Sequence, residues 1–186
     1  MRHSATELGP VYFLTATVNS WNKLLSEDRY KDEIIASLRL LSERGKIQVF
    51  AFVIMPNHIH LIWRLLERNG KESPQGSMLK FTAHRFKQML LDEHGADALI
   101  PYDIKRHNKA YEFWQRDSLA VILISKPVAL QKLNYIHNNL LTERWQVAAN
   151  AAEYKYSSAH YYQTGIDNFG FLHNLHDEFL GMFPEA

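Results

Sequence analysis

The sequence predicts an α+β protein in which an antiparallel sheet carries helices on one face. Two apolar segments, 47–55 and 58–66, follow one another across a two-residue turn, as in a β-hairpin. Segments with apolar residues at helical spacing separate this hairpin from further strand-like segments on either side. The chain has 186 residues, 46% of them hydrophobic and 22% charged, which favours a single globular domain over residues 1–186.

The first two elements are a strand and a helix. Residues 11–18 read VYFLTATV and are rich in β-branched and aromatic residues, which favours a strand. Residues 26–45 are expected to form a helix, because apolar residues recur at helical spacing from Ile34 to Leu41. Gly45 is a plausible C-terminal stop for this helix.

The next two strands form the predicted hairpin. Residues 47–55 are an almost continuous apolar run, as in a strand buried on both faces. Pro56 and Asn57 then signal a turn. Residues 58–66 alternate, so that His58 and His60 project from one face and apolar side chains from the other. Because the apolar face belongs to a core, we expect the histidine face to be the open one.

The second half of the chain adds two helices and a strand. Residues 68–76 are polar and predict a loop, after which Ser77 is expected to cap a helix. Residues 113–124 can supply a strand, and residues 125–141 a third helix. The predicted buried faces of the two helices carry Leu79, Ala83, Phe86 and Leu90, and Ala129, Leu133, Ile136 and Leu140. The first six elements follow the order βαββαβ, which is that of the ferredoxin-like or RRM-like fold and leaves the other sheet face free for a ligand.

Charge and composition narrow the classes of function. The net charge of +1 does not by itself indicate a nucleic-acid-binding protein, but residues 1–144 hold 20 basic and 15 acidic side chains, whereas residues 145–186 hold 1 and 5. The absence of cysteine excludes disulfides, thiolate zinc sites and cysteine nucleophiles. With no signal peptide and no long apolar segment, we expect a cytoplasmic protein that has no membrane partner.

The sharpest chemical feature is the pair His58 and His60. Side chains two residues apart on a strand share a face, so both imidazoles could bind one metal ion. Two half-exposed strand histidines are the alternative, since such pairs arise by chance in a chain with ten histidines. On the third helix, Tyr135 and Asn139 lie one turn apart on a polar stripe. A tyrosine oxygen can act as a covalent nucleophile, and an amide can add an oxygen ligand to a nearby metal.

Three segments resemble the single-tyrosine HUH transposases, and in particular the REP-associated tyrosine transposase branch. They are residues 53–63 (VIMPNHIHLIW), 134–139 (NYIHNN) and 154–162 (YKYSSAHYY), in the family's order. The resemblance covers about residues 11–162 and leaves an acidic, aromatic tail, 163–186, without a match. The family often has Asn-Pro after the tyrosine; here Leu140 follows Asn139, which could change how the helix ends.

The resemblance implies a function and a role for each matching residue. His58, His60 and Asn139 match the ligands of a divalent ion, Mg²⁺ or Mn²⁺, and Tyr135 matches the nucleophile. The enzyme would cut single-stranded DNA that contains a hairpin, forming a 5′-phosphotyrosine bond and a free 3′-OH that can later reverse the reaction. The family includes monomers and homodimers.

Basic side chains near and after the second helix are candidate DNA contacts. They are Lys80, Arg85, Lys87, Lys105, Arg106 and Lys109. Two alternatives to the transposase remain open: a domesticated, non-catalytic DNA-binding module on the same fold, and a metal-dependent phosphodiesterase that uses water in place of Tyr135.

Overall fold

The computed structural model describes residues 7–106, 109–116, 118–142, 145 and 148–179, without the side chains of residues 105, 106, 109 and 110. Its main elements are β1 (Val11–Thr17), α1 (Asp28–Glu43), β2 (Ile47–Met55), β3 (His58–Leu65), α2 (Pro74–His94), β6 (Leu119–Ile122) and α3 (Lys126–Asn139). Shorter elements are β4 (Asp103–Arg106), β5 (Lys109–Tyr111), α4 (Ala159–Thr164) and α5 (Leu175–Glu178). Among the described residues, no helix is both long and apolar enough to span a membrane.

The four main strands form one sheet in the order β2-β3-β1-β6. Each neighbouring pair is antiparallel, so the sheet has the ferredoxin-like order predicted from the sequence. Strand β3 lies in the middle, where Thr15 pairs with His60 and Thr17 with His58 across β1. The two histidines therefore sit on a strand that is held on both sides.

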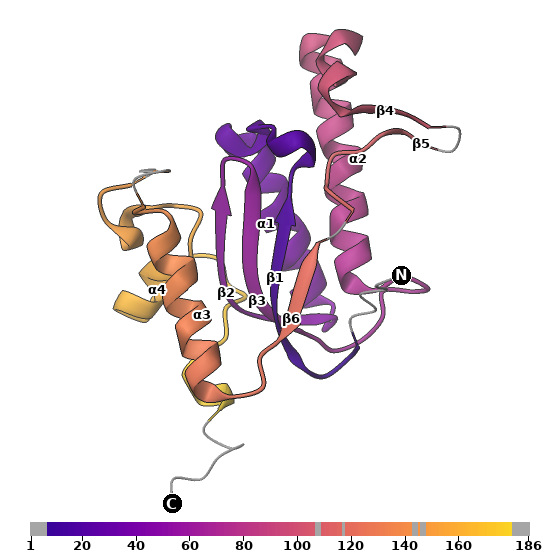
Figure 1. The fold of residues 1–186 in the computed structure, drawn as a ribbon. Coiled ribbons are helices and arrows are strands. Elements are labelled where there is room, and N and C mark those ends of the chain that lie inside the picture. The colour runs from indigo at the N-terminus through magenta and orange to yellow at the C-terminus, as the bar shows by residue number, and fades with distance from the viewer. Residues whose placement is uncertain (1–6, 107–108, 117, 143–144, 146–147, 180–186) are drawn as a thin grey trace, which may run out of the picture.

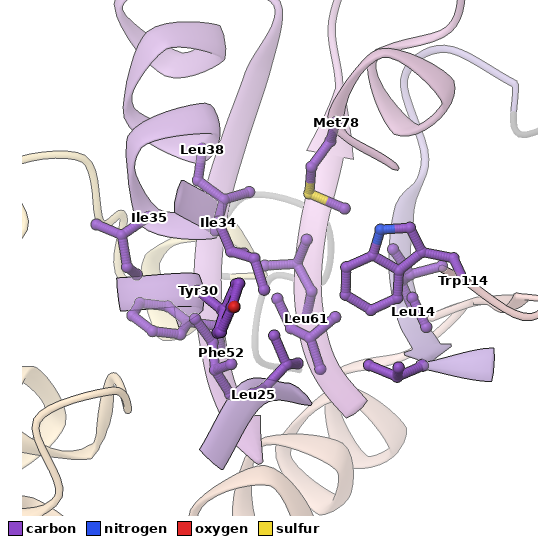
Figure 2. Packing of buried hydrophobic residues seen from close by; sticks show 14 of the residues in the cluster. Leu14, Leu25, Tyr30, Ile34, Ile35, Leu38, Phe52, Leu61, Met78 and Trp114 are labelled. Carbon is purple, nitrogen blue, oxygen red and sulfur yellow. The ribbon is translucent and has the colours of Figure 1, made fainter. Parts of the chain in front are cut away.

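Helices α1 and α2 cover one face of the sheet. Figure 2 shows Tyr30 and Ile34 of α1 and Met78 of α2 packed with Leu61 of β3 and Leu14 of β1. Aromatic rings continue this core, with Tyr30 and Phe86 in edge contact at 5.6 Å between centroids. This core is the predicted one, because the side chains of β3 that alternate with the histidines point into it.

Helix α3 covers part of the opposite face (Figure 1), which corrects the expectation of a free histidine face. Its apolar stripe packs on apolar side chains of β1, β2 and β3 that point away from α1 and α2. The helix contributes Ala129, Leu133, Ile136 and Leu140, and the strands contribute Val11, Phe13, Val53, Met55 and Ile62. A sheet that is apolar on both faces must be covered on both, and the two-sided burial of β2 had already indicated this.

Two predicted boundaries differ from the structure. Helix α2 begins at Pro74 and is capped by Ser73, whose Oγ accepts a hydrogen bond from the backbone N–H of Gly76, so Ser77 lies inside the helix. Proline fits the first helical turn because its missing N–H is not needed there. The strand predicted over 113–124 is reduced to residues 119–122. Before it, Trp114 still forms an isolated antiparallel bridge with Val18 at the end of β1, and Phe113 and Trp114 pack into the core.

The C-terminal segment is packed onto the sheet. Val53 of β2 forms a bridge with Ser157, and Val49 forms another with Leu172. The Arg64 guanidinium on β3 forms a two-point ion pair with the Glu178 carboxylate on α5. Residues 163–179 therefore pack beside β2 and belong to the folded domain.

Candidate functional site

The residues singled out from the sequence converge on one cavity between β1, β3 and α3. It has a volume of about 750 Å³, and His58, His60, Tyr135 and Asn139 all line it. The imidazole rings of His58 and His60 lie with centroids 4.7 Å apart, and the Tyr135 ring meets His60 at 5.1 Å. Four side chains that are up to 81 positions apart in the chain are therefore neighbours in space.

The two histidines are buried rather than open, with exposed fractions of 6% and 5%. His60 is stacked on the Phe13 ring at 5.3 Å, and His58 contacts the Trp145 ring at 5.4 Å. From α3, Tyr135 lies against His60 and Asn139 against His58. The Tyr135 side chain itself is 47% exposed, so the nucleophile candidate remains accessible from solvent.

Hydrogen bonds define which nitrogen of His58 faces the cavity. The Asn57 amide donates from Nδ2 to the Trp21 carbonyl at 3.3 Å, which turns its Oδ1 toward His58. His58 Nδ1 lies 2.7 Å from that oxygen, and an amide oxygen can only accept, so Nδ1 carries the proton. Neutral His58 then has its lone pair on Nε2, which lies 3.3 Å from Nδ2 of Asn139.

His60 is oriented by a side chain of β1. Its Nδ1 lies 2.9 Å from the Thr15 hydroxyl, the residue that pairs with it across the strands, so Nε2 is the nitrogen that could bind a ligand in the cavity. Burial, with smaller contributions from His58 and the Lys132 ammonium, lowers the pKa of His60 to about 3. The ring is therefore neutral at physiological pH, as a metal-binding imidazole must be.

This donor set fits a divalent ion. Across the residues that the structure describes, no three His, Cys, Asp or Glu side chains converge as a metal site. The further donor group beside His58 is the Asn139 amide. Asn139 has Nδ2 toward His58, and a half-turn of its amide plane would bring Oδ1 to the same place. Each histidine holds Nδ1 in a second hydrogen bond, the arrangement by which metal-binding imidazoles are usually oriented.

Lys132 adds a positive charge beside the candidate nucleophile. Its ammonium lies 4.7 Å from the centre of the Phe13 ring and 5.6 Å from that of Tyr135, and it lines the same cavity. A phosphate that reached the Tyr135 hydroxyl would therefore come close to this cation. Its position three residues before Tyr135 was a signal in the sequence, because residues three apart share a helix face.

Buried polar contacts fix α3 over the sheet. His137 Nε2 lies 2.9 Å from the Ser158 hydroxyl, and that hydroxyl also bonds the backbone of Phe52 on β2. Burial lowers the pKa of His137 to about 4, so the ring is neutral. The helix ends at Asn139, and Leu140, the residue that follows it, is fully buried.

The predicted DNA-contacting residues lie away from the cavity. On α2, Lys80 pairs with Glu72, Arg85 pairs with Glu33 of α1, and the Lys87 ammonium lies over the Tyr111 ring. Lys105, Arg106 and Lys109 belong to β4 and β5, whose hairpin projects beside α2 (Figure 1), and their side chains lie outside the described residues. The first set is held by acidic or aromatic neighbours on the far side of the sheet from Tyr135.

Sequence reasoning missed four residues of the site. Asn57 lies within a quoted motif but had no assigned role, and Thr15 could be found only from the register between β1 and β3. Lys132 could have been found from its position three residues before Tyr135, on the same helix face. Trp21 also lines the cavity, and no pattern in the sequence indicates it.

Comparisons with known proteins bear on the fold. No protein-family model matches the sequence, and no curated protein matches it. Among solved structures, the REP-associated tyrosine transposase bound to a REP hairpin is similar over 94% of this chain and 92% of its own, with a TM-score of 0.59 and 16% identity. A candidate transposase from Deinococcus radiodurans R1 gives a TM-score of 0.43 and 16% identity over 74% of this chain and 97% of its own. The first comparison shows that this chain has the fold of the REP-associated tyrosine transposase.

Proposed function

We propose that the protein is a metal-dependent transposase that nicks and rejoins single-stranded DNA through Tyr135. The observation that carries the proposal is the placement of Tyr135 against His60 by α3, with Asn139 against His58 in the same cavity. The similar structure binds a REP hairpin, which supports hairpin DNA as the substrate class. The sequence motifs at these same residues support the same assignment.

The chemistry follows from the residues at the cavity. The Tyr135 oxygen attacks the phosphorus of a phosphodiester, the bond from phosphorus to the 3′-oxygen breaks, and the phenolic proton is lost while the 3′-oxygen gains one. A 5′-phosphotyrosine and a free 3′-OH result, and the reverse attack rejoins the strand without an external energy source. His58, His60 and Asn139 would hold Mg²⁺ or Mn²⁺, which supplies charge neutralisation at the phosphoryl oxygens. Lys132, whose ammonium lies 5.6 Å from the centre of the Tyr135 ring, would balance part of the same charge.

A covalent adduct is the test. The full chain is incubated with Mn²⁺ and a labelled DNA hairpin with single-stranded flanks, and a protein–DNA band is sought on a denaturing gel. We expect the adduct with the wild type and its loss with Tyr135→Phe. Tyr161→Phe on α4 is the matched control and should leave the yield unchanged, because the described cavity does not include Tyr161.

The remaining outcomes identify the alternatives. Cleavage without an adduct would indicate a phosphodiesterase that uses water, and hairpin binding without cleavage would indicate a non-catalytic DNA-binding module. The paired change His58→Ala and His60→Ala should abolish both Mn²⁺ binding and the adduct. Unchanged Mn²⁺ affinity in that variant would remove the histidines from the metal site.

A further inference from the structure

An exposed tryptophan stands at the rim of the cavity. The Trp21 side chain is 54% exposed, yet it lines the same cavity as Tyr135 and Lys132. Of the chain's four tryptophans, Trp63 and Trp114 are buried in the core and Trp145 is partly buried beside His58. An exposed aromatic face beside a cavity is available for stacking on a flat ligand.

The backbone that presents Trp21 is strained. The 3₁₀ turn η1 (Asn19–Trp21) follows β1, and Ser20 and Trp21 have φ angles of 55° and 58°. These are the only positive φ values outside glycine among the described residues, and for a bulky side chain this region is unfavourable. Such strain persists only where the surroundings enforce it, and it concentrates at functional sites.

Hydrogen bonds on several sides enforce this conformation. The Trp21 carbonyl accepts from Asn57 Nδ2, and the Val18 N–H donates to the Asn57 carbonyl at 2.8 Å. The Asn19 N–H donates to the Phe113 carbonyl at 2.7 Å. The turn is therefore tied both to the loop that precedes His58 and to the segment before β6, and these bonds fix the backbone position of Trp21 beside the cavity.

We propose that Trp21 is a stacking platform for an unpaired DNA base next to the phosphate that reaches Tyr135. This inference rests on the proposed function. The cavity supplies the three contacts that a single-stranded nucleotide needs: an aromatic face for the base at Trp21, a cation for the phosphate at Lys132, and the Tyr135 hydroxyl. Stacking tolerates any base, so Trp21 provides affinity and position rather than sequence recognition.

Binding to single-stranded DNA tests the platform without any cleavage. In a Tyr135→Phe background, Trp21→Ala should weaken affinity for an unpaired oligonucleotide by roughly 5- to 150-fold, the range for the loss of one stacked base. Trp21→Phe should retain most of the affinity, and Leu40→Ala, an exposed change on α1 across the sheet, should retain all of it. Equal affinity of Trp21→Ala and the background would overturn the proposal.

An abasic scan separates stacking from a structural role. One nucleotide of the oligonucleotide at a time is replaced by an abasic analogue. At one position, the replacement should weaken binding to the Tyr135→Phe protein by the same factor as Trp21→Ala does. Combining that abasic position with Trp21→Ala should cause no further loss of affinity. Trp21→Gly keeps the carbonyl that holds Asn57 and suits the positive φ, so its unfolding midpoint should be unchanged or higher while its affinity falls. Additive losses at every position, or a lower midpoint in Trp21→Gly, would show that the tryptophan is structural. A missing Tyr135 adduct would refute the proposed function but leave this coupling measurable.

Discussion

At the scale of single residues, the site depends on side chains that orient the histidines. Asn57 is 4% exposed, and its Nδ2 donates a hydrogen bond to the Trp21 carbonyl. This bond leaves its Oδ1 facing His58. The contact between Oδ1 and His58 sets the tautomer of His58 and points the lone pair of Nε2 at Asn139. Asn57 is thus a positioning residue that acts through His58.

We expect Asn57→Ala to weaken Mn²⁺ binding by about 10- to 100-fold, because the tautomer of His58 is no longer fixed. Asn57→Asp keeps an acceptor oxygen and should restore most of the affinity. The measurement is Mn²⁺ titration by calorimetry, with Asn22→Ala as the control, since Asn22 bonds the Asn19 carbonyl in the same loop without contacting a histidine. Wild-type affinity in Asn57→Ala would contradict the assigned role.

The buried His137 predicts a pH dependence of stability. Its pKa in the folded protein is about 4 against 6.5 for a free histidine, so between these values the unfolded chain binds a proton that the folded chain does not. Stability is then complete above pH 6.5 and declines as the pH falls toward 4, by up to about 1.4 kcal/mol per pH unit. His137→Gln, which can still bond Ser158, should reduce this slope in urea unfolding measured at several pH values, while the buried His60 keeps its own contribution. An identical slope would show that His137 does not contribute.

At the scale of elements, the start of α2 depends on which serine caps the helix. The sequence Ser73-Pro74-Gln75-Gly76-Ser77 offers two serines as caps, and the structure selects the first because Pro74 starts the helix. Ser73→Ala should therefore lower the free energy of unfolding by about 1 kcal/mol, as loss of an N-cap does. Ser77→Ala should cost less, and urea unfolding of the two variants decides between the caps. An unchanged free energy of unfolding in Ser73→Ala would contradict the assignment of Ser73 as the cap.

At the scale of the whole molecule, the C-terminal segment is part of the core. Leu175 of α5 is fully buried in the cluster that also holds α3 against the sheet. Leu175→Ala should cost about 2–5 kcal/mol of stability, the usual range for a truncated core leucine. Ile166→Ala, at a position that is 58% exposed, should change stability by less than about 0.5 kcal/mol. Thermal unfolding of both variants is the measurement, and equal midpoints would mean that α5 does not stabilise the fold.

The sequence by itself determined the periodic elements and the chemistry they carry. Strand β2 matches its predicted range, and β1, β3, α1 and α3 match theirs to within two residues, because long apolar repeats dominate local structure. The placement of His58 and His60 on one strand face and of Tyr135 and Asn139 on one helix stripe also follows from period alone. These are local properties, so the sequence pattern is sufficient to predict them.

Tertiary structure decided what these faces meet. Whether the histidine face is open depends on where α3 packs, and that packing is governed by apolar side chains contributed by three strands and the C-terminal segment. Thr15 became a partner of His60 through strand register, and Trp21 reached the cavity through a strained turn that no pattern encodes. Contacts between residues far apart in the chain are set by the packing of the whole molecule. The motifs therefore identify the residues of the site, but only the tertiary fold brings them together.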